Sequence, residues 1–553
     1  MRMYAIQLIK KYLYFTLFTL LFCTYPTFAE VHLPKIFGDN MVLQRGTQVP
    51  VWGTAKPGEN ISLSIQEQRP ITTADEKGAW RITLAPLEAG GPFTMTISGN
   101  NTITFKNILA GEVWICSGQS NMECPVKRTA NAESETANEN NPSIRLFSIP
   151  WILAEKPMDE LYPGNLSSFY KAAAAISLCD HRLGSTVEWT ACTPQTVSDF
   201  SGIGYFFGKE IQSHCGVPVG IIQATWDGSS ITGWMSLASL MSHREFNPIL
   251  DLWGRAFLDY PSAKAEHEKR LMEWEKAKQK AEAVGQPVPA IPWIPRGPEH
   301  HHRPGGMFNG MIAPLIPFGM RGVIWYQGEA DAGGAYLYRL LFRTLIQNWR
   351  ESWRQGDFPF LFAQLANFRS NVHLYKRAPA EPVEPADDYW AELREAQTMA
   401  LTLPNTGMAV TIDIGEPDNI HPKNKREVGR RFALAAGKVA YGENIEFSGP
   451  MYKSMAIGKS VIRLMFDHVG GGLIAKGGER LKGFAVAGAD RKFVWAEARI
   501  EGNQVIVWSE KVTEPVAVRY AWASYPDCNL YNAEGLPASP FRTDSWPGIT
   551  EGR

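Results

Sequence analysis

The sequence is poor in three features that would each assign it to a class of proteins. Lys and Arg total 55 against 56 Asp and Glu, so the chain has no net charge that would recruit nucleic acid or an anionic membrane. Seven cysteines in 553 residues are too few for a disulfide scaffold, and their spacing follows no zinc-binding pattern. After residue 29, no apolar run is long enough to span a bilayer. A globular chain of about three domains remains.

The first 29 residues have the composition of a secretory signal. Basic residues within the first eleven positions precede an apolar run from Tyr12 to Phe22, and Thr27-Phe28-Ala29 closes the segment. We therefore expect cleavage after Ala29 and a secreted or periplasmic protein. Cys23 suggests a lipoprotein signal, but Phe22 is bulky where such a signal has a small residue. Of the six remaining cysteines, Cys179 and Cys192 either form a bridge or stay as buried thiols.

Three sequence patterns follow one another after the signal. Residues 30–108 alternate apolar and polar positions between Gly-, Pro- and Asn-rich turns, which is typical of an all-β sandwich. The pattern of residues 109–444 predicts strands, loops and helices in alternation. In residues 445–553, apolar and polar positions alternate again, which predicts a second β domain. A charged helical insertion is expected at about 262–304. Its Pro-rich end contains His300, His301 and His302, which we expect in a solvated surface loop.

The middle region contains short, continuous apolar runs separated by helical segments. Such runs are typical of parallel strands that are covered on both faces. The predicted strands are residues 113–115, 217–224, 322–326, 360–365 and 408–412, with a buried helix over 202–211. The carboxyl ends of parallel strands are where such sheets bind their ligands, so the residues that follow these strands are the candidates for chemistry.

Ser120 follows the first of these strands. Val113, Trp114 and Ile115 form the strand, Ser117-Gly118 marks a sharp turn, and Ser120-Asn121-Met122-Glu123 has the spacing of a capping box at a helix start. A strand, a sharp turn and a helix present one side chain at the edge of a sheet. Ser120 is therefore either a helix cap or a nucleophile, and the second interpretation needs a base and oxyanion donors elsewhere.

Asp418-Asn419-Ile420-His421 supplies the base. The segment lies between the strand at 408–412 and a helical run that begins at Lys425. An acid near a histidine can fix its tautomer and leave the other ring nitrogen free for proton transfer, as in Ser-His-Asp chemistry. We expect His421 to accept the proton of Ser120 and Asp418 to orient His421. Taken singly, each would more simply be a loop or turn residue.

Three donors are candidates for an oxyanion hole. Ser120 has its own N–H at a helix start, Gly228 follows the strand at 217–224, and Gln327 ends the strand at 322–326 with an uncharged amide. The structural alternatives are a turn glycine for Gly228 and a buried amide that satisfies loop backbone for Gln327.

These motifs together resemble the SGNH hydrolase superfamily and, within it, the secreted sialate O-acetylesterases. The resemblance rests on Gly118 to Met122, Trp226 to Ser229, Trp325 to Asp331 and Asp418 to His421, and extends to Met41 to Arg45, Arg519 to Trp522 and Asn529 to Asn532. It covers nearly all of the chain after the signal. One departure is Gln327, where many relatives have asparagine.

The resemblance implies a flavodoxin-like three-layer α/β/α catalytic domain flanked by all-β domains. It also implies a serine esterase that removes O-acetyl groups from sialic acids and needs no metal or other cofactor. Acetylxylan or another acetylated polysaccharide is an alternative substrate, and a non-catalytic glycan-binding protein is an alternative of another class. The 18 tryptophans mildly favour a carbohydrate ligand.

Overall fold

The structure is a computed structural model that describes residues 30–137, 139–162, 170, 187–369, 384–478 and 480–552. The predicted signal and Cys179 lie outside these residues. Within them, Cys192 is a buried free thiol, and burial raises its pKa to about 12. The described residues contain no helix that combines the length and the apolar character needed to cross a membrane.

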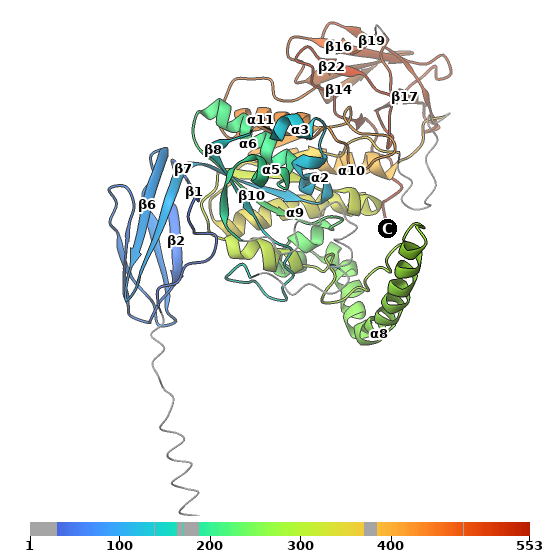
Figure 1. Ribbon diagram of the computed structural model, residues 1–553. Coiled ribbons are helices and arrows are strands. Elements are labelled where there is room, and N and C mark those ends of the chain that lie inside the picture. Colours follow the sequence, from blue (N-terminus) through green and yellow to red (C-terminus); the bar gives the residue numbers. More distant parts are fainter. Residues whose placement is uncertain are drawn as a thin grey trace, which may run out of the picture. The chain divides into compact units, whose positions relative to one another are not determined.

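The chain divides into two compact units. The smaller unit contains residues 50–84 and 94–104 and is built from strands (Figure 1). Its strands are β2 (Val49–Thr54), β3 (Asn60–Ser64), β4 (Ile71–Thr73), β5 (Ala79–Leu84) and β6 (Gly90–Ser98). β2 pairs with β5, and β3 lies between β4 and β6. Alternate residues of β5 are buried, as the sequence pattern predicts.

The larger unit contains the central sheet, in the order β13-β12-β11-β7-β10-β8-β9. Its strands are β7 (Thr102–Gly118), β8 (Asn141–Ser148), β9 (Trp189–Cys192), β10 (Val219–Thr225), β11 (Gly322–Tyr326), β12 (Phe360–Gln364) and β13 (Thr406–Val410), and β1 (Val42–Gln44) pairs with β7. All neighbours from β13 to β8 are parallel, and only β9 is antiparallel at the edge. The predicted parallel strands are confirmed.

Helices follow most of these strands. They are α2 (Ser120–Glu123), α3 (Ala132–Thr136), α5 (Pro194–Ser198), α6 (Gly202–Cys215), α7 (Leu237–Met241), α8 (Asn247–Ala283), α9 (Ala335–Trp353), α10 (Tyr389–Thr398) and α11 (Lys425–Val439). Ser201 caps α6 by accepting the Gly204 N–H at 3.0 Å. The predicted charged helix is part of α8, which begins well before residue 262. α6 and α11 pack closely because Gly429 has no side chain to meet Phe206.

The C-terminal strands form further sheets in the same unit. One sheet is β14 (Met451–Ile457), β15 (Ile462–Asp467), β20 (Gln504–Trp508) and β19 (Glu497–Glu501), and another is β18 (Phe493–Trp495), β17 (Phe484–Ala487), β21 (Ala517–Tyr520) and β23 (Phe541–Arg542). β16 (Leu473–Ala475) pairs with β22 (Leu530–Asn532). Inward residues of these strands share one apolar core that includes Leu464, Val486 and Val518. The predicted β content after residue 444 is confirmed.

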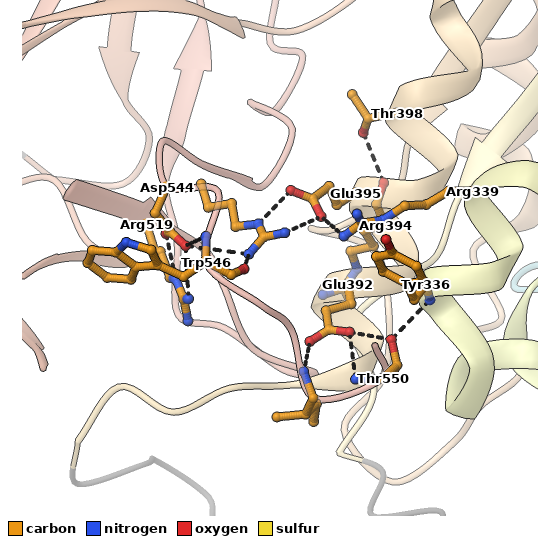
Figure 2. Close-up of polar contacts among 12 residues, drawn as sticks. Tyr336, Arg339, Glu392, Arg394, Glu395, Thr398, Arg519, Asp544, Trp546 and Thr550 are labelled. Carbon is orange, nitrogen blue, oxygen red and sulfur yellow. Dashed lines mark hydrogen bonds and ion pairs between the residues drawn. The ribbon is translucent and has the colours of Figure 1, made fainter. Parts of the chain in front are cut away.

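Buried charges join these β sheets to α10. The guanidinium of Arg394, which is fully buried, donates to the carbonyls of Leu365 and Ala366 beyond β12 and to those of Ala523 and Ser524 beyond β21. Figure 2 shows Glu392 and Glu395 on the same helix contacting the C-terminal segment. Glu395 accepts hydrogen bonds from Arg339 of α9 and from Arg542 of β23.

Glu392 fixes the end of the chain, and this contact generates a prediction for stability. Its carboxylate is 1% exposed and accepts the N–H groups of Ile549 (2.6 Å) and Thr550 (3.1 Å) and the Thr550 hydroxyl. Glu392→Ala leaves these donors without an acceptor, so we expect the free energy of unfolding to fall by about 2–4 kcal/mol in urea denaturation. Glu551→Ala, at an exposed neighbouring position, should change it by less than about 0.5 kcal/mol. Equal effects of the two substitutions would contradict the prediction.

Candidate active site

Ser120 lies directly beyond the carboxyl end of β7, the central strand of the sheet. Gly118 ends the strand with φ +134°, and a Cβ at this position would lie 2.1 Å from the carbonyl oxygen of Tyr326 at the end of β11. The Gln119 N–H donates to the same carbonyl at 3.0 Å, and the Trp226 N–H donates to the Gly118 carbonyl at 3.0 Å. The turn before Ser120 is therefore held by the ends of both neighbouring strands, and only glycine fits at position 118.

The predicted capping box is wrong. Ser120 is the first residue of α2 rather than its cap, and Gln119 occupies the cap position without a side-chain hydrogen bond to the helix. Glu123 accepts the indole N–H of Trp151 at 2.9 Å instead. The capping role of Ser120 is thereby removed, and its hydroxyl makes no hydrogen bond within the described part of the chain.

Two backbone N–H groups, at Ser120 and in the neighbouring loop after β10, make no hydrogen bond with the described residues. The N–H groups of Ser120 and Gly228 have no acceptor among the described residues. The first N–H groups of a helix have no partner within the helix, which accounts for Ser120. Gly228 follows β10 in the left-handed region at φ +65°, where glycine is unstrained. Since β10 neighbours β7 in the sheet, both donors lie at the same sheet edge.

Gln327, by contrast, is fully engaged inside the protein. Its side-chain NH₂ donates to the Ser229 carbonyl at 3.0 Å and to the Asp331 carboxylate at 2.6 Å, while its oxygen accepts the Tyr338 hydroxyl at 2.9 Å. The side chain is completely buried. In this geometry neither amide hydrogen is left for an oxyanion. Gln327 instead joins the loops that follow β10 and β11.

His421 lies in the loop between β13 and α11, with its backbone fixed by Asn419. Asn419 accepts the His421 N–H at 3.0 Å and donates to the His421 carbonyl at 2.8 Å. The pKa of His421 is lowered to about 4, first by burial and then by the charges of Lys425 and Arg128. Its ring makes no hydrogen bond within the described residues. His421 is therefore neutral at pH 7 and able to accept a proton.

Asp418 lies on the outer side of the same loop. Its side chain is 49% exposed and accepts a hydrogen bond from Arg369 at 3.3 Å. The groups that shift the pKa of His421 are two cations and burial, with no carboxylate among them. The orienting role of Asp418 therefore stays a prediction.

A buried polar network, which the sequence analysis did not predict, joins the segments that contain Ser120, Gln327 and His421. The Asn121 side chain accepts the Lys425 ammonium at 2.5 Å and donates to Glu329 at 2.5 Å and to the Ile420 carbonyl at 3.0 Å. Lys425 and Asn121 are at most 1% exposed. The network holds the residues next to Ser120, Gln327 and His421 at fixed positions, although these bonds link residues up to 304 positions apart.

The three consecutive histidines lie inside the protein, so the predicted solvated loop is wrong. His300 and His301 are each 3% exposed, and the His301 ring stacks on Trp226 with centroids 6.0 Å apart. His302 Nε2 lies 2.6 Å from the Gly228 carbonyl oxygen and donates to it. Burial lowers the pKa of all three rings. The described residues contain no group of three or more His, Cys, Asp or Glu arranged to hold a metal ion.

Glu329 generates a prediction for the pH dependence of stability. Burial raises its pKa to about 7, and its Oε2 has no hydrogen-bond partner in the structure. Because the pKa is about 4.5 in the unfolded chain, the folded state holds this proton more tightly. The resulting stabilisation is complete below about pH 4.5 and is lost as the pH rises to about 7, by about 3 kcal/mol.

Glu329→Gln removes this titration and keeps an oxygen for Asn121. Between pH 4.5 and 7.5, the wild-type protein should lose about 3 kcal/mol of unfolding free energy relative to the variant, measured by urea denaturation at each pH. Glu551→Gln, which is exposed, should show a constant difference from the wild type. A constant difference for Glu329→Gln as well would contradict the assignment.

Comparisons with known proteins agree on one group. The family described as carbohydrate esterase, sialic acid-specific acetylesterase, matches residues 304–438. Sialate O-acetylesterase of Mus musculus is 28% identical over 546 residues, 91% of this chain and 92% of the mouse protein, and that of Homo sapiens is 26% identical over 563 residues, 92% of each chain. A carbohydrate acetylesterase from Xanthomonas citri, known from its crystal structure, is 36% identical with a TM-score of 0.75, over 93% of this chain and 100% of that one.

Proposed function

Since the chain belongs to the carbohydrate esterases related to sialate O-acetylesterase and is a carbohydrate O-acetylesterase, we propose that it removes O-acetyl groups from sialic acids through an acetyl-Ser120 intermediate. The proposal includes an SGNH-type, flavodoxin-like three-layer catalytic domain. The parallel order of β13-β12-β11-β7-β10-β8 supports this arrangement. It also includes export, based on the signal predicted in residues 1–29.

The observation that supports the mechanism is the position of Ser120 together with the N–H groups of Ser120 and Gly228, which have no acceptor among the described residues. β7 lies between β10 and β11, where the strand order reverses, and ligands of open α/β sheets bind outside the carboxyl ends of strands at such a switch point. Ser120 follows β7 and Gly228 follows β10. Their N–H groups are the uncommitted donors that an oxyanion requires, and one such donor typically contributes about 3 kcal/mol to the transition state.

The reaction then has two balanced steps. Ser120 Oγ attacks the acetyl carbonyl carbon while His421 accepts the hydroxyl proton, and the resulting oxyanion accepts the N–H groups of Ser120 and Gly228. The bond to the sugar oxygen breaks as His421 returns the proton to that oxygen, which leaves acetyl-Ser120. Water attacks the acetyl group with His421 as base, and acetate leaves as Ser120 regains its proton.

Asp418 is the proposed orienting acid, and Gln327 a positioning residue rather than an oxyanion donor. The absence of a bond between Ser120 and His421 is compatible with this chemistry, because catalytic hydrogen bonds are often long in unliganded sites and shorten in the substrate complex. The oxyanion hole of the proposal therefore consists of backbone amides, since both Gln327 hydrogens are engaged.

Ser120→Ala tests the nucleophile. Without the hydroxyl, no acetyl-enzyme forms, so we expect kcat on an aryl acetate to fall by about 10⁶-fold. A serine-directed phosphonate should label the wild-type protein at Ser120, as found by peptide mass spectrometry, and should leave the variant unlabelled. Ser134→Ala, on exposed α3, should keep both activity and labelling. Full turnover in Ser120→Ala, with acetate release unchanged, would refute the mechanism.

The lowered pKa of His421 predicts the acid limb of the rate profile. The imidazole must be neutral to accept a proton, so kcat/KM should fall as the pH falls through about 4 rather than through 6.5. Arg128→Gln removes one of the two cations that lower this pKa, so the limb should move to higher pH, while Arg491→Gln, in the C-terminal β region, should leave it in place. A limb near pH 6.5 in the wild-type protein would contradict the assignment of His421 as the base.

A further inference from the structure

A cavity of about 580 Å³ lies between the central sheet and the C-terminal β sheets. Asn367, Ile412 and Asp413 line it from the sheet side, and Trp495, Trp522 and Tyr525 line it from the β side. Its size is that of a small-ligand site. Trp522 belongs to a motif that the sequence analysis singled out and that the proposed reaction does not use.

The cavity lies at the same sheet edge as the proposed reaction. Asn367 follows β12 and Asp413 follows β13, and Asn367 accepts the Gly415 N–H at 2.7 Å at the start of the loop that leads to His421. Arg369 connects the two regions, because it donates to Asp418 at 3.3 Å and places its guanidinium 5.8 Å from the ring centroid of Tyr525. A chain held in the cavity is therefore adjacent to the loop that carries the proposed base.

The aromatic side chains of the cavity provide faces for sugar rings. Trp495 ends β18 with 45% of its surface exposed, although a large apolar side chain is normally buried. Trp522 is 92% buried, and the guanidinium groups of Arg519 and Arg542 lie 5.3 and 5.4 Å from its ring centroid. Its indole N–H is also buried and has no hydrogen-bond partner among the described residues. Indoles combine a flat apolar face with one polar donor, which suits a ligand that is apolar on one side and hydroxylated on the other.

The charges that line the cavity are already paired. Lys482 contacts Asp527 at 2.9 Å, and Asp413 accepts two hydrogen bonds from Arg431 and one from Tyr531. A carboxylate ligand would have to share Lys482 with Asp527 and would lie near the carboxylate of Asp413, whereas an uncharged ligand meets neither repulsion. The paired charges and the aromatic faces together favour a neutral sugar over an anionic one.

We propose that this cavity binds uncharged sugar units of the glycan whose acetylated residue reaches Ser120. The part of this proposal that directs the glycan toward Ser120 rests on the proposed function. The binding of sugar units in the cavity does not. The exposed face of Trp495 stacks on a sugar ring, Trp522 forms part of the wall, and Asn367 and Tyr525 offer hydrogen bonds to hydroxyl groups. The site would let the enzyme distinguish an acetylated sugar within a chain from the same sugar alone.

Direct binding tests the cavity without any turnover. Isothermal titration calorimetry of the full chain would use a panel of oligosaccharides without acetyl groups: xylohexaose, galactose-containing neutral oligosaccharides and free sialic acid. We expect at least one neutral oligosaccharide to bind and Trp495→Ala to weaken that binding at least tenfold. Trp508→Ala, a partly exposed tryptophan of β20 outside the cavity, should leave it unchanged. Binding of free sialic acid alone, binding of no member, or equal binding by Trp495→Ala would overturn the proposal.

Kinetics then separate this proposal from the proposed function. Trp495→Ala should raise KM for acetylated oligosaccharides at least tenfold and leave kcat/KM for an aryl acetate unchanged, because the small ester does not reach the cavity. Loss of aryl acetate activity in Ser120→Ala with normal oligosaccharide binding supports both proposals. Full aryl acetate activity in Ser120→Ala with normal oligosaccharide binding would refute only the nucleophile.

Discussion

The buried ammonium of Lys425 is the interaction on which the candidate site depends. Lys425 is the first residue of α11, where the helix dipole is unfavourable for a cation, and burial lowers its pKa further. An ammonium removed from water needs acceptors close by, and Asn121 provides one. Once the Asn121 oxygen is engaged, its NH₂ group is directed to Glu329 and to the Ile420 carbonyl. Through its hydrogen bond to Asn121, one buried cation thus helps to fix the positions of the loops that contain Ser120, Gln327 and His421.

Close backbone contact fixes the remaining geometry. Gly118 brings the end of β7 against the Tyr326 carbonyl, and Gly228 adopts a left-handed conformation beside the rings of His301 and His302. His302 donates to the carbonyl of Gly228 and so fixes the peptide group that follows this glycine. The N–H of Gly228 has no acceptor among the described residues. The loops beyond β7 and β10 are therefore rigid for reasons that lie in their neighbours, which is the condition for preorganised donors.

The sequence predicted five of the seven strands of the central sheet, since each of the five contains a short, continuous apolar run, but it did not predict β8 or β9, whose residues are mixed in polarity. The run 322–326 has the bounds of β11, and the order of strands and helices indicated a parallel sheet. The predicted positions of Ser120, Gly228 and Gln327 beyond their strands follow from the same pattern, whereas the roles of Ser120, His421 and Asp418 remain predictions. The alternation of apolar and polar residues on both sides of the central region also predicted the strands that the structure contains there.

The errors have a common physical cause, because each depends on a distant partner. Ser120 and Glu123 have the local spacing of a capping box, but the indole of Trp151 binds Glu123 instead. The histidine run looks polar, but Trp226 and Tyr170 enclose it. Gln327 is uncharged and ends a strand, but Ser229 and Asp331 take both of its hydrogens. Lys425 appeared to be an ordinary helix residue, and its partner is 304 positions away.

Arg394 gives the C-terminal β sheets a particular relation to the rest of the chain. Its single guanidinium is divided between carbonyls that follow β12 and carbonyls that follow β21, and no water reaches it. The C-terminal region supplies two of the four carbonyl acceptors of this cation, and losing them while the guanidinium stays buried would be strongly destabilising. The C-terminal region therefore completes the solvation of a cation that belongs to the α/β region, and we expect the two regions to unfold together.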